Sequence, residues 1–252
     1  MSPAAAKVAV VTGGARGIGR GCALELARRG YDIALVDLLA PEMKRTAGEI
    51  EAVGRRALAY QADVASFARA HEVAADVARQ WNRIDFLLND AGASNAKGIL
   101  DIEEEEFDRT IAVNLKSCFN YIHAIAPIML AQDTGGRIAS MSSLNALSGG
   151  VTSAVSKHAY AAAKAGILGL TRALAKELGP KIAINAICPG VIETELGNSL
   201  TKARGAELTK GIVLDRLGTP ADVAQLVAFL ATCEPCFITG QHFVIDGFQW
   251  SC

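Results

Sequence analysis

The residues Lys7-Val-Ala-Val-Val-Thr-Gly-Gly-Ala-Arg-Gly-Ile-Gly19 join a short apolar run to a glycine-rich loop and the start of an amphipathic segment. Glycine lets a backbone turn tightly and approach a pyrophosphate group, which then lies on the N-terminus of the following helix. A plain tight turn would not need four glycines, at positions 13, 14, 17 and 19. A strand, a glycine loop and a helix in this order indicate a dinucleotide-binding unit.

The same alternation of strand and helix patterns continues along the chain. Strands are expected at residues 7–12, 32–37, 56–61, 84–89, 136–142, 182–187 and 242–246. Helices are expected at residues 17–29, 41–53, 66–81, 102–115, 117–132, 159–179, 194–210 and 221–232, with a possible bend at residues 115–117. The strands are nearly continuous apolar runs, as strands buried on both faces should be. This predicts an α/β fold, a doubly wound parallel sheet of about seven strands with helices on both faces, formed by residues 1–252 as a single domain.

Composition excludes several classes of protein. The chain has 252 residues, 51% of them hydrophobic, and a formal net charge of −1. No basic stripe favours nucleic acid, and no apolar run reaches the ~18 residues of a membrane span. The N-terminal residues lack the pattern of a signal peptide, so a cytoplasmic location is expected.

The cysteines and histidines give no metal signal. Cys22, Cys118 and Cys188 lie in apolar segments and are expected to be reduced core thiols. Cys233 and Cys236 have the C-x-x-C spacing, but a zinc site would need two further ligands. They are interpreted as loop thiols, with a disulfide between them left open, and the four histidines are scattered.

Asp37 ends the second expected strand, 18 residues after Gly19. A carboxylate at this place hydrogen-bonds the adenosine ribose hydroxyls of NAD and repels the 2′-phosphate of NADP. At a separation of ~5 Å and an effective dielectric of ~20, the repulsion costs on the order of 3 kcal/mol. Arg16 would offset part of this by reaching a phosphate, but NAD is favoured over NADP.

Tyr160 and Lys164 are four residues apart in a predicted helix, so their side chains share one face. A free phenol has a pKa near ~10, and a cation within about 4–6 Å favours the phenolate form. The pair is therefore a candidate general acid and base. Alone, it would equally describe two residues that merely share a helix surface.

The motifs together resemble the short-chain dehydrogenase/reductase family, in its branch of about 250 residues, over essentially the whole length. Residues 12–19 fit T-G-x-x-x-G-x-G, and Tyr160 with Lys164 fits Y-x-x-x-K. The other matching positions are Asp63-Val64, Asn89-Asp90-Ala91-Gly92, Asn114, Ser143, Pro189-Gly190 with Thr194, residues 216–220 and 239–241, and Asp246-Gly247.

The resemblance implies a catalytic tetrad of Asn114, Ser143, Tyr160 and Lys164. Tyr160 would be the general acid or base, Lys164 would hold the nicotinamide ribose, and Ser143 would bond the substrate oxygen. Asn114 would hold a water that connects Lys164 to solvent. The implied cofactor-binding residues are Gly13, Arg16, Gly17, Ile18, Gly19, Asp37, Asp63, Val64, Asn89, Ala91, Gly92, Tyr160, Lys164, Pro189, Gly190, Ile192 and Thr194.

Two positions depart from the family pattern. Asp90 replaces the second Asn of N-N-A-G, which alters packing beside the cofactor without removing a catalytic group. Ser143 lies 17 residues before Tyr160, whereas the family usually has about 13, which indicates an insertion within residues 144–158. Ser142 is the rival for the catalytic serine, but only one of two successive residues on a strand faces the site.

The expected function is hydride transfer between NAD(H) and a secondary alcohol or ketone. The alternatives are an NADPH-dependent 3-oxoacyl-[acyl-carrier-protein] reductase-like enzyme and a nucleotide-binding protein without turnover. By resemblance, residues 191–210 form a substrate lid, and the protein is a homotetramer that pairs through its two long helices and its last strand. A small-residue face of Ala159, Ala162, Ala163, Gly166 and Gly169 would allow close helix packing. The substrate, a small molecule, is not identified by these residues.

Overall fold

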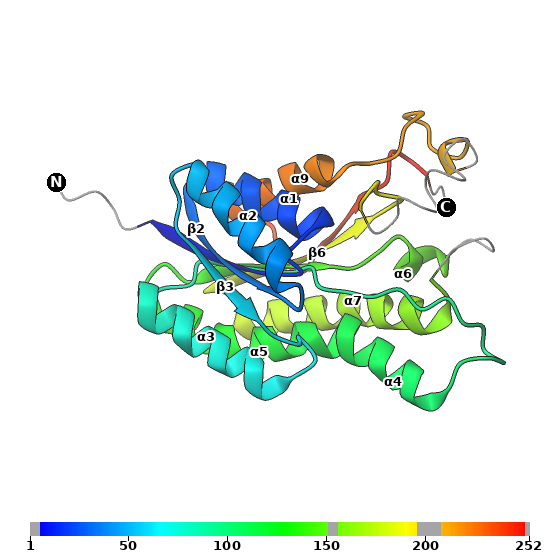
Figure 1. Cartoon of the computed structure of the whole chain (residues 1–252), viewed down its shortest axis with the longest axis horizontal. Helices are drawn as coiled ribbons and strands as arrows, with labels where there is room; N and C mark the ends of the chain where they lie inside the picture. Colours follow the sequence, from blue (N-terminus) through cyan, green and yellow to red (C-terminus); the bar gives the residue numbers. More distant parts are fainter. Residues whose placement is uncertain (1–5, 151–155, 196–207, 250–252) are drawn as a thin grey trace.

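The computed structural model describes residues 6–150, 156–195 and 208–249 (Figure 1). Seven parallel strands form one sheet in the order β3-β2-β1-β4-β5-β6-β7. The strands are β1 (Lys7–Thr12), β2 (Tyr31–Asp37), β3 (Ala57–Gln61), β4 (Phe86–Asn89), β5 (Gly136–Met141), β6 (Ile182–Pro189) and β7 (His242–Ile245). The predicted doubly wound parallel sheet is confirmed.

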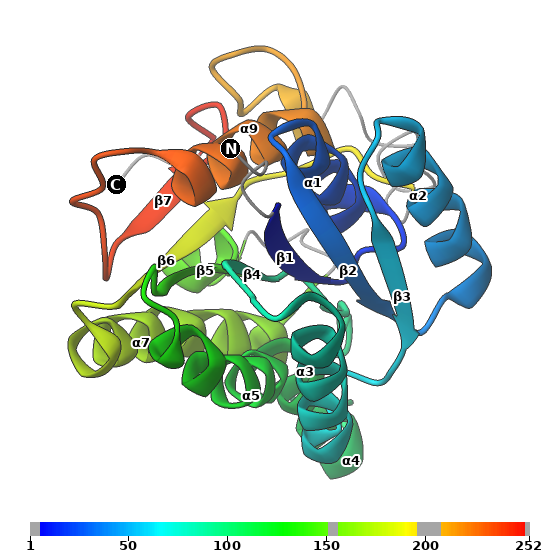
Figure 2. The same cartoon turned by 90° about the vertical axis from the view of Figure 1, so that its left-hand side faces the viewer.

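Helices cover both faces of the sheet (Figure 2). One layer contains α1 (Gly17–Arg28), α2 (Ala40–Ala52) and α9 (Pro220–Thr232). The other contains α3 (Phe67–Trp81), α5 (Ser117–Ala131) and α7 (His158–Leu178), with α4 (Glu104–Ile111) continuing α5 through a π-helical segment, η1 (Ala112–Lys116). A short helix, α6 (Asn145–Ser148), follows β5.

The central strands divide the core into two clusters. Val8 and Val10 of β1 pack with the layer of α3, α5 and α7, whereas Ala9 and Val11 pack with the layer of α1, α2 and α9. Successive residues of a strand point to opposite faces, so a strand with helices on both sides must be apolar at every position. This explains why the strands read as continuous apolar runs.

The predicted elements agree with the structure to within about two residues at most ends. Ser66 is the N-cap of α3 rather than its first residue, because its hydroxyl accepts the Arg69 N–H at 3.3 Å. Helix α4 begins at Glu104 rather than at residue 102, since Glu103 and Glu106 form a capping box there. Helix α6 was not predicted, and most of the helix expected at residues 194–210 lies outside the described residues.

The predicted bend at residues 115–117 is instead the π-helical segment η1. Asn114 lies in this segment, and its side-chain amide donates to the Thr110 carbonyl at 2.9 Å. A side chain that takes up a helix carbonyl competes with the backbone N–H that would otherwise use it. We attribute the wider turn to this bond.

Among the described residues, no helix is both long and apolar enough to span a bilayer. Cys22, Cys118 and Cys188 are buried free thiols, as predicted, and burial raises the pKa of each. Cys233 and Cys236 are half-buried free thiols after α9.

Candidate active site

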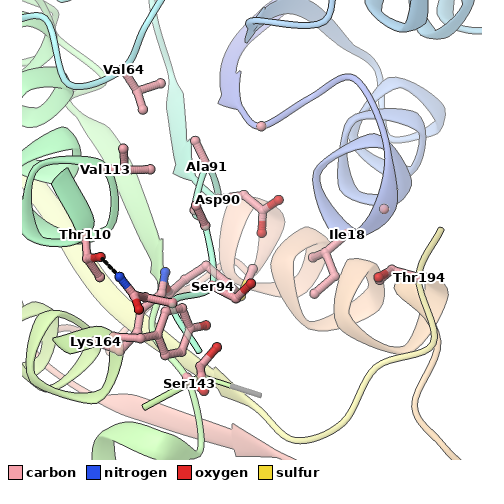
Figure 3. Close-up of a pocket in the computed structure, with 18 of the residues that line it drawn as sticks. Ile18, Val64, Asp90, Ala91, Ser94, Thr110, Val113, Ser143, Lys164 and Thr194 are labelled. Atoms are coloured by element: carbon pink, nitrogen blue, oxygen red, sulfur yellow. Dashed lines mark hydrogen bonds between the residues drawn. The ribbon is translucent and has the colours of Figure 1, made fainter. Parts of the chain in front are cut away.

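A pocket of about 740 Å³ opens at the carboxyl ends of the strands, where β1 and β4 lie side by side. The chain order reverses at this point of the sheet, and ligands of doubly wound folds bind in the crevice beyond such a reversal. Of the predicted site residues, those that line the pocket are Gly13, Arg16, Gly17, Ile18, Asp37, Asp63, Val64, Ala91, Gly92, Ser143, Tyr160, Lys164, Pro189, Gly190, Ile192 and Thr194 (Figure 3 labels several of them). Gly19, Asn89 and Asn114 lie behind this lining.

The glycine loop between β1 and α1 has no room for side chains. Gly13 has a φ of +71°, and a Cβ there would lie 2.8 Å from the Ala91 nitrogen. A Cβ on Gly19 would lie 2.2 Å from the Gly13 carbonyl oxygen. The loop therefore passes close to the chain after β4 and leaves the N-terminus of α1 open toward the pocket. A dinucleotide pyrophosphate fits this cradle, because the glycines put no Cβ atoms between the backbone and the pocket. Two of the backbone N–H groups are already bonded to carboxylates, that of Ala15 to Asp37 and that of Gly19 to Asp90.

Thr12 connects the end of β1 to the segment that follows β4, the two neighbouring strands at which the chain order reverses. Its hydroxyl accepts the backbone N–H groups of Asp90 and Ala91 at 3.1 and 3.2 Å and donates to the Leu88 carbonyl. One side chain at the end of β1 thus fixes the segment that leaves β4. Asn89 lies beneath this segment and donates to Ser140 at 3.2 Å, which makes it a residue of the supporting sheet.

Asp37 stands at the end of β2, at the edge of the pocket. Its carboxylate accepts the Ala15 N–H and the Leu39 N–H, each at 3.2 Å. These bonds orient the carboxylate and leave lone pairs for a further donor such as a ribose hydroxyl. Arg16, the residue before α1, is half-buried in the same part of the pocket.

Asp63 and Val64 line the pocket beyond β3. Burial would raise the pKa of Asp63, but hydrogen bonds from the Arg109 side chain and the Ala65 N–H, both at 2.9 Å, hold it below its ordinary value. The Asp63–Arg109 ion pair connects this loop to α4 across the mouth of the pocket.

Tyr160 and Lys164 lie in the first two turns of α7 and both face the pocket. The Lys164 Nζ atom lies 5.6 Å from the centre of the Tyr160 ring. Lys164 is only 3% exposed, and its ammonium donates to the Met141 carbonyl at 2.7 Å. A buried ammonium fixed at this distance supplies a positive charge beside the phenol ring.

Ser142 and Ser143 follow β5 and have different environments. The Ser142 hydroxyl is buried and donates to the Lys164 carbonyl at 2.8 Å. Ser143 is half-buried, and its hydroxyl accepts the Asn145 N–H at 3.2 Å, where α6 begins. Ser143 therefore keeps its own hydroxyl proton available to a ligand, and it lines the same pocket as Lys164 (Figure 3).

Asn114 lies fully buried in η1, behind the pocket wall. Its side chain accepts the Ala93 N–H at 3.1 Å and donates to the Ala93 and Thr110 carbonyls, both at 2.9 Å. A Cβ on Gly92 would lie 2.8 Å from the Asn114 oxygen and 3.4 Å from the Lys164 Nζ. Asn114 and Lys164 thus border the same glycine from two helices.

The segment after β6 closes the pocket beside α1. Gly190 packs against Asp246, since a Cβ there would lie 2.7 Å from the Asp246 Cβ atom. Ile192 forms a bridge with Gly218, and the Thr194 side chain approaches Gly17, where an added Cβ would meet it at 3.6 Å. Thr194 is therefore brought to the glycine loop, and Pro189, Gly190 and Ile192 line the same pocket.

Sequence reasoning did not assign several further lining residues, namely Leu38, Leu39, Ala62, Asn95, Thr110, Val113, Met141 and Ser156. Most of these residues belong to no sequence motif, and they line the pocket only because the folded backbone brings them there. Ser156 lies four residues before Tyr160 but outside α7, which begins at His158, so helical spacing did not mark it.

Asp90 also lines the pocket, next to Gly92 and the glycine loop. As a whole residue it is half-buried, but its carboxyl group is enclosed. Burial raises the pKa of Asp90 to about 7, Lys164 and a hydrogen bond with the Gly19 backbone oppose the rise, and Asp37 adds to it. A carboxyl group that titrates near neutrality is thus part of the site.

The fold and the pocket define a dinucleotide-binding oxidoreductase, and the comparisons agree. A family model described as enoyl-(acyl carrier protein) reductase matches residues 13–247. Oxidoreductase UcpA of Salmonella typhimurium is 37% identical over 98% of this chain and 95% of that protein. The 3-oxoacyl-[acyl-carrier-protein] reductase FabG of Staphylococcus epidermidis is also 37% identical, over 96% of this chain and 98% of that protein.

A solved structure described as a short-chain dehydrogenase/reductase, glucose/ribitol dehydrogenase, from Brucella melitensis has a TM-score of 0.89 to this chain. It is 30% identical, and the match covers 98% of this chain and 97% of that one. The chain therefore belongs to the short-chain dehydrogenase/reductase family of oxidoreductases, whose cofactor is NAD(P).

Proposed function

We propose that the chain transfers a hydride between NAD(H) and a secondary alcohol or ketone, with Tyr160 as the general acid and base. The observation that carries this proposal is the meeting of Tyr160, Lys164 and Ser143 in the pocket that the glycine loop and Asp37 also border. When bound, the nicotinamide cofactor supplies or accepts the hydride. Gly13, Gly17 and Ile18 would hold its pyrophosphate, Asp37 its adenosine ribose, and Ile192 and Thr194 its nicotinamide end.

In the proposed reaction, protein side chains transfer one proton to or from the substrate oxygen and stabilise the negative charge that this transfer leaves on the phenol oxygen. In ketone reduction Tyr160 would give its phenol proton to the carbonyl oxygen, and in alcohol oxidation it would take the hydroxyl proton back. Lys164 would stabilise the negative charge that is left on the phenol oxygen, and Ser143 would donate to the reacting oxygen. Asn114 would support a water next to Lys164 that returns the proton from solvent.

Asp37 should make the protein prefer NADH over NADPH on the order of 100-fold in Kd, because one like-charge contact costs on the order of 3 kcal/mol. Asp37→Asn should reduce this preference at least tenfold, since the amide oxygen still accepts the Ala15 or Leu39 N–H while the negative charge is gone. Fluorescence titration with each dinucleotide measures both values. Tighter binding of NADPH by the unmodified protein would mean that Arg16 outweighs Asp37.

A second candidate function is NADPH-dependent reduction of a 3-oxoacyl thioester. The 37% identity to the FabG reductase of Staphylococcus epidermidis favours it, and the carboxylate of Asp37 opposes it. Parallel assays with secondary alcohols and NAD⁺, and with β-ketoacyl thioesters and NADPH, separate the two. A nucleotide-binding protein without turnover ranks third, because Tyr160 and Lys164 both face the pocket.

We further propose that the chain works as one domain, with residues 191–210 as the lid over the substrate, and that it assembles as a homotetramer in the cytoplasm. Residues 196–207 of this lid lie outside the described residues. A shallow apolar groove between η1, α5 and α7 supports the assembly, and Leu115, Phe119, Gly166, Gly169 and Leu170 line it. The predicted small-residue face is corrected by the structure, because Ala159 and Ala163 are buried within the subunit. Only Ala162, Gly166 and Gly169 remain accessible to a second copy.

Phe119→Glu should break this assembly from four chains to two, because a charge placed in an apolar interface loses its hydration without a partner. Phe119 is 43% exposed in the single chain, so the substitution should leave the fold intact. Val53→Glu is the matched control, since Val53 is equally exposed at the end of α2 in the opposite helix layer. Light scattering reports the mass; a tetramer that persists in Phe119→Glu would place the contact elsewhere.

A further inference from the structure

Asp90 is the one acidic side chain that lies between the glycine loop and Lys164 among the described lining residues of the pocket. It follows β4, and Figure 3 shows its carboxyl group pointing toward the start of α1, near Ile18. This is the helix N-terminus on which the proposed pyrophosphate would lie. The carboxyl group and the cofactor phosphates therefore compete for the same positive end of α1.

The surroundings of the carboxyl group act on it in both directions: its enclosure in the protein favours the neutral form, whereas the hydrogen bond from the Gly19 backbone N–H favours the ionised form. A Cβ atom added to Gly19 would lie 2.8 Å from the Asp90 Oδ2 atom and 2.2 Å from the Gly13 carbonyl oxygen. The carboxyl group and this carbonyl group therefore both lie next to Gly19. Within the part of the chain that the structure describes, no cation lies within 4.0 Å of this group, because the nearby Lys164 ammonium is bonded to Met141.

The charged and titratable groups that act on Asp90 are Lys164 from α7, Asp37 from β2 and the Cys22 thiol from α1. Burial raises the pKa of the Cys22 thiol well above its ordinary value, so Cys22 stays neutral near pH 7. Lys164 attracts the Asp90 charge and Asp37 repels it, while burial raises the pKa of Asp90 to about 7. The free protein at neutral pH is thus close to the midpoint between the two forms of Asp90.

We propose that Asp90 couples dinucleotide binding to the uptake of one proton, so that the chain holds its cofactor with Asp90 in the neutral carboxylic acid form. The negative pyrophosphate disfavours an adjacent carboxylate, and a protonated carboxyl offers the same shape and polarity as the Asn that the family usually has here. The inference rests on the proposed dinucleotide binding. It assigns Asp90 as a positioning residue that makes cofactor affinity depend on pH.

The direction in which NADH affinity changes with pH follows from the linkage between proton binding and cofactor binding. Binding that requires the protonated form is strongest below the pKa of the free protein and weakens tenfold for each pH unit above it. With that pKa at about 7, the NADH Kd should rise roughly 25-fold between pH 6.5 and pH 8.5. Asp90→Asn cannot ionise, and its NADH Kd should change less than about twofold over the same range.

The test is a fluorescence titration with NADH at several pH values for both proteins. Calorimetry in two buffers with different heats of ionisation then counts protons, with close to one taken up per chain at pH 8 by the unmodified protein and none by Asp90→Asn. Parallel pH profiles for the two proteins, within threefold of each other, overturn the inference alone. Failure to bind NADH or NADPH at any pH overturns the proposed function together with it.

A second measurement needs no cofactor. A carboxyl whose pKa is raised in the folded state destabilises the fold increasingly as the pH rises from its unfolded value of about 4 toward 7. Asp90→Asn should therefore unfold at a higher temperature than the unmodified protein at pH 8, and the difference should shrink at pH 5. A difference that stays constant with pH would show that Asp90 does not titrate in this range, and would overturn the inference.

Discussion

Tyr160→Phe should lower kcat by about 10²- to 10⁴-fold, the usual contribution of a positioned general acid and base. The substitution removes only the phenol hydroxyl, so the ring that lies 5.6 Å from the Lys164 ammonium stays in place. The glycine loop and Asp37 are untouched, and the NADH Kd should change less than about threefold. The measurement uses the alcohol or ketone that the unmodified protein turns over best, together with a fluorescence titration of NADH.

Tyr60→Phe is the matched control for this experiment. The Tyr60 hydroxyl in β3 donates to Asp76 at 2.7 Å, and the residue does not line the pocket. Its loss removes a partly buried hydrogen bond that contributes about 1 kcal/mol to stability, without an effect on turnover. Full activity of Tyr160→Phe would refute the role of Tyr160, and an equal loss in both variants would show that the phenols act through stability.

Gly19→Ala should weaken NADH binding about a hundredfold and destabilise the fold by about 1–3 kcal/mol. The added methyl group would lie 2.2 Å from the Gly13 carbonyl oxygen, which is backbone and moves only with the whole loop. Displacement of a ligand cradle by about 1 Å is enough to cost such a factor. NADH titration and thermal unfolding measure the two effects separately.

Gly48→Ala is the control, because Gly48 also lies within a helix but has no atom within 4 Å of an added Cβ. There the methyl group should raise stability by about 0.5–1 kcal/mol through the better helix propensity of alanine, with unchanged NADH affinity. Gly19→Ala with the NADH affinity of the unmodified protein would show that the cofactor does not use this loop.

The local patterns of the sequence predict most of the fold. Apolar runs predict the seven strands because each strand of a sheet covered on both faces must be apolar throughout. Ser66 begins a helix by capping its N-terminus, and Gly30, with its φ of +92°, ends one. Both effects involve residues only a few positions away in the sequence. Such features are visible without knowledge of the tertiary structure.

The parts that could not be predicted depend on contacts between distant residues. The π-helical segment η1 arises from one side-chain bond of Asn114, which does not change the hydrophobic periodicity. The burial of Ala159 and Ala163 depends on which side of α7 meets the sheet. Asp90 was noted as a departure from a motif, but its raised pKa follows from burial, which Lys164 on α7 and the Gly19 backbone on α1 oppose, and only the fold creates these surroundings.

At the candidate site, the spacing of residues in the sequence predicts some contacts and not others. The spacing of Tyr160 and Lys164 predicts a shared face, and both residues do line the pocket. Strand alternation predicts that only one of two successive serines faces the site, but Ser142 and Ser143 both lie beyond the end of β5 and both line the pocket. They differ in their bonds, because the Ser142 hydroxyl is bonded to the Lys164 carbonyl. The Met141 carbonyl that holds the Lys164 ammonium is 23 residues away, and no motif marks it.

The two bonds between the end of β5 and α7 have a consequence for how this protein can diversify. Ser142 donates to the carbonyl of Lys164, and Lys164 donates to the carbonyl of Met141, so strand and helix are tied in both directions. The loop between them can lengthen or change composition while its two anchor points keep their separation. Ser156, near the end of this loop, lines the pocket, so changes in the loop can alter which molecule is accepted while both bonds remain. An exchange of residues 145–156 with a relative should therefore change substrate preference without abolishing turnover.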